Sequence, residues 1–307
     1  MWAALLEGRD ASSDLREGRW SEFLGEPPRV AERVARAHTR GGYLSDIKGF
    51  DSEFFALSKM EADNVDPQQR MALELTWQAL EHARIPASSL RGADVGVYVG
   101  SSNNDYMLLA VADPTTAHPY AITGTASSII ANRVSYFFDF RGPSESIDTA
   151  CSSSLVAAHQ GVQALRSGEI DVAIVGGVNA MVTPIVTIGF DEVGGGVLAP
   201  PDGRCKSFSS DANGYARSEG GGMLALKRLS DAAATGGTRS WQSSPAPRST
   251  TTAGPTACWP PNPDAQEAVL RKAYKNAGID PRDVDYIEAH GTGTILGDPI
   301  EADAWAG

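Results

Sequence analysis

The chain has 307 residues, 42% of them hydrophobic and 32 of them glycine, which is typical of a tightly turned α/β protein with one large or two small domains. Its net charge of −12 and its lack of a basic run argue against nucleic acid or an anionic membrane surface as a partner. The three cysteines include no CxxC pair, which argues against a disulfide framework and a zinc site and favours a reducing cytosol, and no signal peptide or membrane-length apolar run is visible.

Two helices are predicted in the first part of the chain. Residues 1–6 have the pattern of the middle of an amphipathic helix. Asp66 followed by Pro67 predicts a second helix start, because the carboxylate caps free N–H groups and proline fits the first helical position. The buried stripe of this second helix is expected to include Leu73, Trp77 and Leu80, and Pro86 ends the pattern.

Short apolar runs that end in glycine follow, and they are typical of buried strands. We predict strands at 95–100, 171–177, 220–227 and 284–289, an extended run at 144–147, and a helix at 265–277 that stops at Gly278. Strands that alternate with helices imply an α/β layered architecture, in which reactive residues lie at strand ends.

Residues 148–155 read DTACSSSL, so Cys151 lies between a predicted extended run and a predicted helix. At a helix N-terminus, free N–H groups and the helix dipole favour the nucleophilic thiolate. Leu155, Ala158, Val162 and Leu165 form the expected buried stripe of that helix. A nucleophile on a sharp strand-to-helix turn is one interpretation, and a buried, inert thiol is the other.

The stretch 288–294 reads EAHGTGT and places His290 where the predicted strand meets a loop of glycine and threonine. The glycines would let a substrate chain approach the backbone, and the hydroxyls of Thr292 and Thr294 could hydrogen-bond it. A structural histidine is the plainer alternative for this position.

Together these motifs resemble the β-ketoacyl synthase domain of polyketide synthases, a condensing enzyme of the thiolase-like superfamily. The resemblance covers nearly the whole chain, and some detail at 57–63 and 118–124 resembles mycobacterial synthases of methyl-branched lipids. The motifs, in family order, are DPQQR at 66–70, GP at 142–143, DTACSSS at 148–154, PDGRCK at 201–206, RSEG at 217–220, EAHGTGT at 288–294 and GDPIEA at 297–302.

The resemblance implies a thiolase-like layered α-β-α-β-α fold, with the N-terminal half nearly complete and the C-terminal half truncated. It implies that Cys151 accepts the acyl chain as a thioester and that His290 assists decarboxylation of a malonyl or methylmalonyl extender. Thr292 and Thr294 match positions that contact the pantetheine arm of a carrier protein. Asp298 and Glu301 are expected to orient the loop and the neighbouring helix, and Cys205 is expected to be structural.

The same resemblance implies a cytoplasmic enzyme without a cofactor or metal of its own, since its substrates are carried on the phosphopantetheine of an acyl carrier protein. Its expected partners are acyl-carrier and acyltransferase domains and a second copy in a homodimer. The first family strand and the second catalytic histidine have no match in the sequence. We therefore expect a catalytically incomplete remnant as the alternative to an active synthase, and a thiolase or hydrolase using Cys151 as a third possibility.

The expected organisation is an N-terminal half at 1–236, an aberrant segment at 237–261 and the start of the C-terminal half at 262–307. Residues 239–261 are rich in Ser, Thr and Pro, which is typical of a linker or inserted loop. When residues 239–261 are written back as DNA in GC-rich codons and read with the frame shifted by one base, a different peptide results. That peptide contains an apolar strand and an Asn-x-Asp-Gly loop that resemble the family's segment at this point. The hypothesis is an out-of-frame stretch, and the glycines at 194–196 and the prolines at 200–201 are candidate smaller insertions.

Overall fold

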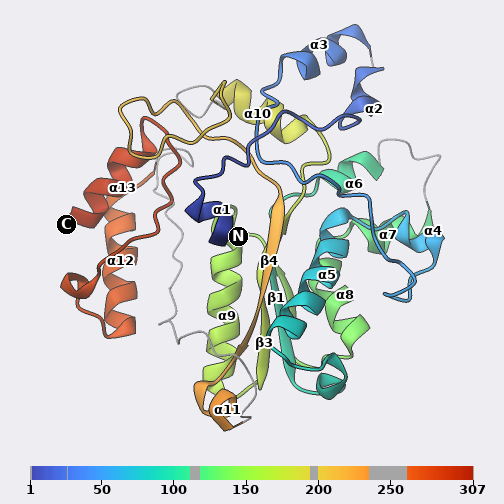
Figure 1. The fold of residues 1–307 in the computed structure, drawn as a ribbon, viewed down its shortest axis with the longest axis vertical. Helices are drawn as coiled ribbons and strands as arrows, with labels where there is room; N and C mark the ends of the chain where they lie inside the picture. The colour runs from blue at the N-terminus through green and yellow to red at the C-terminus, as the bar shows by residue number, and fades with distance from the viewer. Residues whose placement is uncertain (1, 26, 111–117, 194–199, 235–260, 307) are drawn as a thin grey trace.

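The computed structural model describes residues 2–25, 27–110, 118–193, 200–234 and 261–306. Figure 1 shows a twisted sheet with helices on both faces and two helices, α12 and α13, set to one side of it. The strands are β1 (Val95–Gly100), β2 (Ser144–Ile147), β3 (Val172–Asn179) and β4 (Gly220–Lys227). The longer helices are α3 (Pro28–Arg36), α5 (Pro67–His82), α8 (Ile129–Phe138), α9 (Ser153–Ser167), α10 (Ile185–Val193), α12 (Pro263–Ala277) and α13 (Gly297–Ala306). The shorter ones are α1 (Trp2–Leu6), α2 (Ser21–Leu24), α4 (Lys59–Ala62), η1 (Ala87–Leu90), α6 (Asp105–Ala110), α7 (Pro119–Thr125), α11 (Leu229–Ala234) and η3 (Pro281–Asp283).

The sheet has the strand order β2-β1-β3-β4. Strand β1 runs parallel to both β2 and β3, whereas β4 runs antiparallel to β3. All six residues of β1 are buried, because this strand is covered by neighbours at both edges and by helices on both faces. That position explains its continuous apolar sequence, as predicted for a buried parallel strand.

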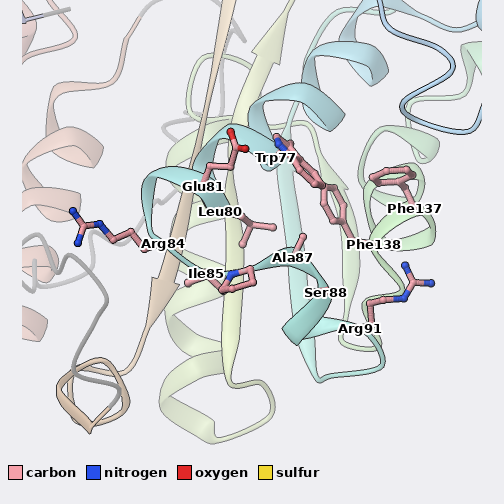
Figure 2. A pocket seen from close by; sticks show the side chains of 11 residues that line it. Trp77, Leu80, Glu81, Arg84, Ile85, Ala87, Ser88, Arg91, Phe137 and Phe138 are labelled. Carbon is pink, nitrogen blue, oxygen red and sulfur yellow. The ribbon is translucent and has the colours of Figure 1, made fainter.

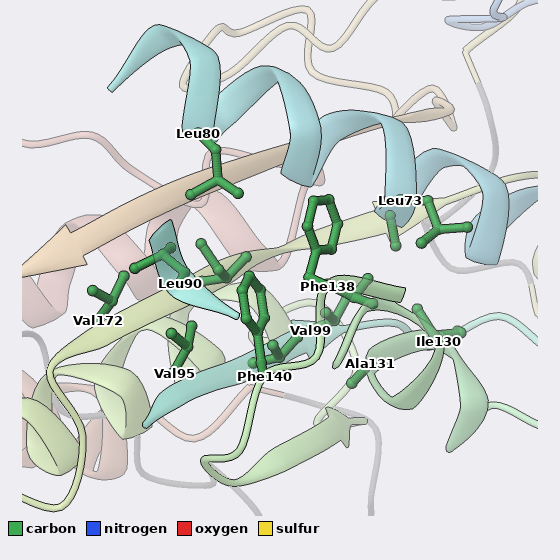
Figure 3. Packing of buried hydrophobic residues seen from close by; sticks show 14 of the residues in the cluster. Leu73, Leu80, Leu90, Val95, Val99, Ile130, Ala131, Phe138, Phe140 and Val172 are labelled. Atoms are coloured by element: carbon green, nitrogen blue, oxygen red, sulfur yellow. The ribbon is translucent and has the colours of Figure 1, made fainter. Parts of the chain in front are cut away.

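Helices α5 and α8 cover one face of the sheet, and α9 covers the other. Figure 3 shows the larger core, in which side chains of α5 and α8 meet those of the sheet. Leu73, Leu80 and Phe138 lie in this core together with Val95 and Val99 of β1. A smaller core fills the space between the sheet and α9. The described residues thus form a three-layer α-β-α unit, which accounts for three layers of the expected thiolase-like fold.

Helix α5 begins as the sequence predicts. The Asp66 side chain accepts a 2.7 Å hydrogen bond from the Gln68 backbone N–H, and Pro67 occupies the first helical position. Leu73 and Leu80 are each 1% exposed, and Trp77 packs against the core from a half-buried position. The predicted stripe of α5 is therefore confirmed.

The predicted stripe of α9 is wrong at three of its four positions, since Leu155 is 58% exposed, Ala158 and Val162 are only half-buried, and Leu165 alone is buried. The residues that α9 buries are Ser153, Ala157, Gly161, Ala164 and Leu165. The physical reason is close packing on the sheet, because a Cβ atom on Gly100 of β1 would lie only 2.5 Å from the Ser154 backbone nitrogen. At such a separation only small side chains fit, so residue size selects the buried face at the start of α9, whereas Leu165 is buried at its far end.

The predicted strand at 284–289 is also wrong. The segment follows η3 without strand pairing, and the side chains of Tyr286 and Ile287 are 76% and 41% exposed. A strand forms only where a neighbour satisfies its N–H and C=O groups, and no described segment lies beside this one as a partner strand. Of the aberrant segment 237–261 only Pro261 is described, and the glycines at 194–196 lie outside the described residues. None of the described helices has the length and apolar character needed to cross a membrane.

Candidate active site

Cys151 lies on a sharp turn between β2 and α9, as the sequence predicts. The turn depends on Ala150, whose φ of 55° places a non-glycine residue in the left-handed region. The Asp148 side chain accepts a 3.0 Å hydrogen bond from the Ala150 N–H. The Ser153 hydroxyl accepts from the Thr149 N–H at 2.9 Å and donates to the Ala150 carbonyl at 2.6 Å. These local bonds hold the turn that presents the thiol.

The Cys151 thiol is free and exposed, which contradicts the interpretation of a buried, inert cysteine. It is separated from Ser153, the first of the 15 residues of α9, only by the N-cap residue Ser152. Position and exposure therefore suit a nucleophile.

Tyr215 interacts electrostatically with both described cysteines, Cys151 and Cys205, and the sequence motifs give no indication of it. Burial raises the pKa of Tyr215, the Arg217 guanidinium lowers it, and coulombic interactions with Cys151 and Cys205 raise it by a smaller amount. The Sγ atom of Cys205 accepts a 3.4 Å hydrogen bond from the Ala216 N–H, which is in keeping with the structural role expected for it. We refer to the segment that carries Cys205 and Tyr215, residues 205–217, as the 205–217 loop.

Two carboxylates of α13 shape the loop that carries His290. Glu301 accepts hydrogen bonds from the backbone N–H groups of His290, at 2.7 Å, and Gly291, at 2.9 Å. Asp298 is 4% exposed and accepts from the Gly293 N–H at 3.0 Å. Both acids act on the backbone of the loop, which confirms the expectation that they orient it.

The 205–217 loop is hydrogen-bonded both to the His290 loop and to the acid of α13 that positions it. The Phe208 N–H donates to the second oxygen of Asp298 at 2.6 Å, and the Gly214 N–H donates to the Gly293 carbonyl at 2.9 Å. Gly293 has a φ of 71°, and a Cβ atom there would lie 2.8 Å from the Lys206 nitrogen. The glycine is therefore required for the approach of this chain's own backbone.

The hydroxyls of Thr292 and Thr294 lie 2.9 Å apart and share a hydrogen bond. The Thr294 hydroxyl also accepts from the Gly297 N–H at 3.0 Å, so it satisfies a free donor at the start of α13. Both side chains are half-buried. Thr292 consequently keeps more hydrogen-bonding capacity for a substrate than Thr294 does.

The side chains of Cys151 and His290 are both exposed, and among the described residues no hydrogen bond joins them. They are connected indirectly, because Tyr215 interacts electrostatically with Cys151 and its neighbour Gly214 is bonded to the His290 loop. Within the described ranges no group of three or more His, Cys, Asp or Glu side chains could hold a metal ion.

An exposed thiol on a strand-to-helix turn, together with a histidine loop, is typical of α/β enzymes that transfer acyl groups. Comparison with family models agrees with this class. The beta-ketoacyl synthase N-terminal domain matches residues 1–232, and the beta-ketoacyl synthase C-terminal domain matches residues 249–307. The chain belongs to the beta-ketoacyl synthase family.

Its relatives are polyketide synthases. The chain is 48% identical over 304 residues to a phenolphthiocerol/phthiocerol polyketide synthase of Mycobacterium bovis, an alignment that covers 99% of this chain and 16% of the relative. It is 43% identical over 306 residues to 6-methylsalicylic acid synthase of Penicillium terrestre, covering 100% of this chain and 17% of that enzyme. The chain thus spans about a sixth of the length of the curated relatives that it matches.

Solved structures give the same family and the same fold. An oxazolomycin ketosynthase domain of Streptomyces albus superposes with a TM-score of 0.85 at 37% identity, covering 99% of this chain and 52% of that one. The ketosynthase from module 6 of the Bacillus subtilis bacillaene synthase gives a TM-score of 0.82 at 35% identity, covering 99% and 50%. The thiolase-like fold of ketosynthases is therefore confirmed for this chain.

Proposed function

We propose that the chain provides the acyl-accepting part of a β-ketoacyl synthase, which joins an acyl group on Cys151 to a malonyl or methylmalonyl unit on a carrier protein. The observation that carries the proposal is the exposed Cys151 thiol on its strained turn at the start of α9. Family membership and similarity to polyketide synthases over 99% of the chain support it.

In the first step the Cys151 thiolate attacks the carbonyl of a carrier-bound acyl thioester. A new S–C bond forms on the enzyme, the bond between the acyl carbon and the carrier's phosphopantetheine sulfur breaks, and that sulfur leaves as a thiolate. A covalent intermediate of this kind divides one difficult acyl transfer into two easier ones. The free N–H groups at the start of α9 lie where they can stabilise the oxyanion of the tetrahedral intermediate.

In the second step the extender loses its carboxylate as CO₂, and the electron pair of the broken bond forms an enolate. The His290 imidazole is the proposed donor to the enolate oxygen. The enolate carbon then attacks the Cys151 thioester, so a C–C bond forms and the thiolate leaves. Thr292 and Thr294 are proposed to contact the pantetheine arm, with Thr292 the stronger candidate because its hydroxyl is less committed.

The proposed partners are acyl-carrier and acyltransferase domains and a second copy of the synthase, in a reducing cytoplasm that keeps Cys151 as a thiol. Supporting these proposals, the relatives are several times longer than this chain and the first of them is named as one component of a polyketide synthase. The organisation into 1–236, 237–261 and 262–307, with an out-of-frame middle segment, also stays a proposal, and genomic DNA sequence tests it directly.

Two half-reactions test the function on the chain as it exists. Incubation with an acyl-carrier thioester should add one acyl group to Cys151, detected by peptide mass spectrometry. Cys151→Ala should abolish the adduct, and Cys205→Ala should leave it unchanged. With malonyl carrier, release of CO₂ should fall about 10²-fold or more in His290→Ala, because that variant removes the proposed oxyanion donor.

The outcomes separate the alternatives. Acylation of Cys151 without condensation would identify a half-active remnant, and steady release of free acid would identify a hydrolase. Acylation of Cys205 in place of Cys151 would overturn the assignment. Asp298→Asn provides a matched control for loop position, because it should weaken decarboxylation while leaving acylation of Cys151 intact.

A further inference from the structure

A hollow lies at the C-terminal end of α5, and no step of the proposed reaction uses it. Figure 2 shows this cavity of about 630 Å³ between α5, the segment leading into η1, and the end of α8. Its apolar floor is formed by Trp77, Leu80, Ile85, Phe137 and Phe138. The rings of Trp77 and Phe137 are only half-buried, so they present apolar surface that a partner could cover.

The hollow is separate from the site around Cys151. It lies next to η1, which precedes the first residue of β1, whereas the last residue of β1, Gly100, contacts the backbone of Ser153 and Ser154 beside Cys151. A strand of six residues is about 20 Å long. The two sites therefore lie at opposite ends of the sheet.

The charges around the hollow contrast with the rest of the molecule. Arg84 and Arg91 lie on opposite sides of the apolar floor and point away from each other. Both are exposed, and in the described part of the chain neither guanidinium has a hydrogen-bond or ion-pair partner. Glu81 lies on a third side. In a chain with a net charge of −12, the residues that line the hollow thus carry two cations and one carboxylate.

The positions of Arg84 and Arg91 on either side of the apolar floor favour a peptide over a small anionic ligand. A small ligand with one anionic group can approach Arg84 or Arg91 but cannot pair with both, because the floor separates them. A peptide can place apolar side chains on the floor and a carboxylate on each side. The segment 239–261 does not fit this description, since it contains two tryptophans but arginines in place of carboxylates.

We propose that this hollow docks a peptide segment of a partner polypeptide in which large apolar residues are flanked by acidic residues. The floor supplies the apolar contact area, with Trp77 as the kind of side chain that dominates binding energy at interfaces. Arg84 and Arg91 supply specificity for the flanking acids, because charge complementarity excludes basic partners more than it adds affinity.

Two fluorescein-labelled peptides, EELLWLLEE and its basic twin KKLLWLLKK, test the proposal by fluorescence anisotropy with the full chain. The acidic peptide should bind about tenfold more tightly than the basic one, as two exposed charge pairs warrant. The double variant Arg84→Glu, Arg91→Glu should reverse that preference. Ser88→Trp, which fills the hollow from an exposed position, should weaken both peptides.

Equal binding of the two peptides would overturn the proposal, as would binding that Ser88→Trp leaves unchanged. No binding of either peptide up to about 1 mM would also overturn it. Binding of dodecanoate at the hollow without binding of the acidic peptide would instead establish a small-amphiphile site. Alkylation of Cys151 should proceed at the same rate in every variant, so failure here is distinguishable from failure of the proposed synthase function.

Discussion

Ala150 determines the geometry of the candidate nucleophile at the scale of a single residue. Its φ of 55° costs an alanine about 1–2 kcal/mol relative to the right-handed conformation. The cost is offset by the bonds around it, which include two hydrogen bonds made by the Ser153 hydroxyl. Strain of this kind persists where surrounding contacts over-determine the backbone, and here it directs the Cys151 thiol outward.

A valine at this position should lower stability and disturb the thiol together. The β-branched side chain tolerates a positive φ poorly, so Ala150→Val should reduce the free energy of unfolding by about 1–3 kcal/mol. Urea unfolding measures this loss, and iodoacetamide alkylation of Cys151 reports the position of the thiol. The residue is exposed, so loss of core packing does not complicate the result.

Glycine at the same position is the matched control. Ala150→Gly should stay within about 1 kcal/mol of the parent, since relief of strain offsets the extra freedom of the unfolded chain. Equal stability of the valine and glycine variants would show that the left-handed turn is absent in solution.

The contact between α9 and the end of β1 sets the position of the site at the scale of secondary structure. Gly100 lies against the backbone of Ser153 and Ser154, so there is no space for a side chain. Gly100→Ala should force the helix away from the sheet and cost about 1–3 kcal/mol, as overpacking of a tight contact does. Thermal unfolding measures the cost, and slower acylation of Cys151 should accompany it.

Gly189 provides the comparison for that substitution. It lies within α10, and a Cβ atom there would meet nothing within 4 Å. Gly189→Ala should therefore raise stability by about 0.5–1 kcal/mol, because alanine restricts the unfolded chain and favours helix. A similar loss of stability in both variants would contradict the packing argument.

The sequence predicted those elements whose pattern follows from their own residues. The apolar runs of β1 and β3 reflect burial on both faces, and the Asp66-Pro67 start of α5 reflects local capping. Elements that depend on a distant partner were predicted less well. Residues 284–289 have the composition of a strand, but no described neighbour pairs with them. The exposure of Leu155 likewise depends on how closely the helix approaches the sheet.

The residues of the candidate site show the same difference between local and distant causes. Cys151 and His290 are recognised from motifs because the residues beside them carry the chemistry. Tyr215 has no motif that points to Cys151, since their proximity comes from the path of the 205–217 loop. The hollow beside Trp77 was also missed, because a half-buried aromatic has the same sequence pattern whether or not a cavity adjoins it.

A buried polar network that includes Asp66 makes the stability of the whole molecule depend on pH. Asp66 is 3% exposed, and its side chain bonds to the backbone and side chain of Gln68. Gln68 in turn donates to the Asn103 carbonyl beyond the end of β1, and the Asn103 side chain accepts from the Asp105 N–H. Burial raises the pKa of Asp66 to about 6, and burial raises that of Asp105 as well.

The stability that depends on Asp66 should fall as the pH rises from about 4 to about 6. In that window the folded protein keeps a proton that the unfolded chain has released. The shift from 3.8 to about 6 corresponds to roughly 3 kcal/mol lost by pH 7. Asp66→Asn removes the titration but keeps an N-capping side chain. The free energy of unfolding of this variant should exceed that of the parent increasingly across the window, as measured by urea unfolding.

Asp46 offers a control with the opposite sign. It is exposed, and hydrogen bonds from the N–H groups of Gly49 and Lys48 lower its pKa. The stability that it contributes is present above its unfolded pKa and is lost as the pH falls through its folded one. Asp46→Asn should therefore change the pH profile only below about pH 4. A difference between Asp66→Asn and the parent that is constant from pH 4 to 7 would contradict a raised pKa, because a lost contact without a titration has no pH dependence.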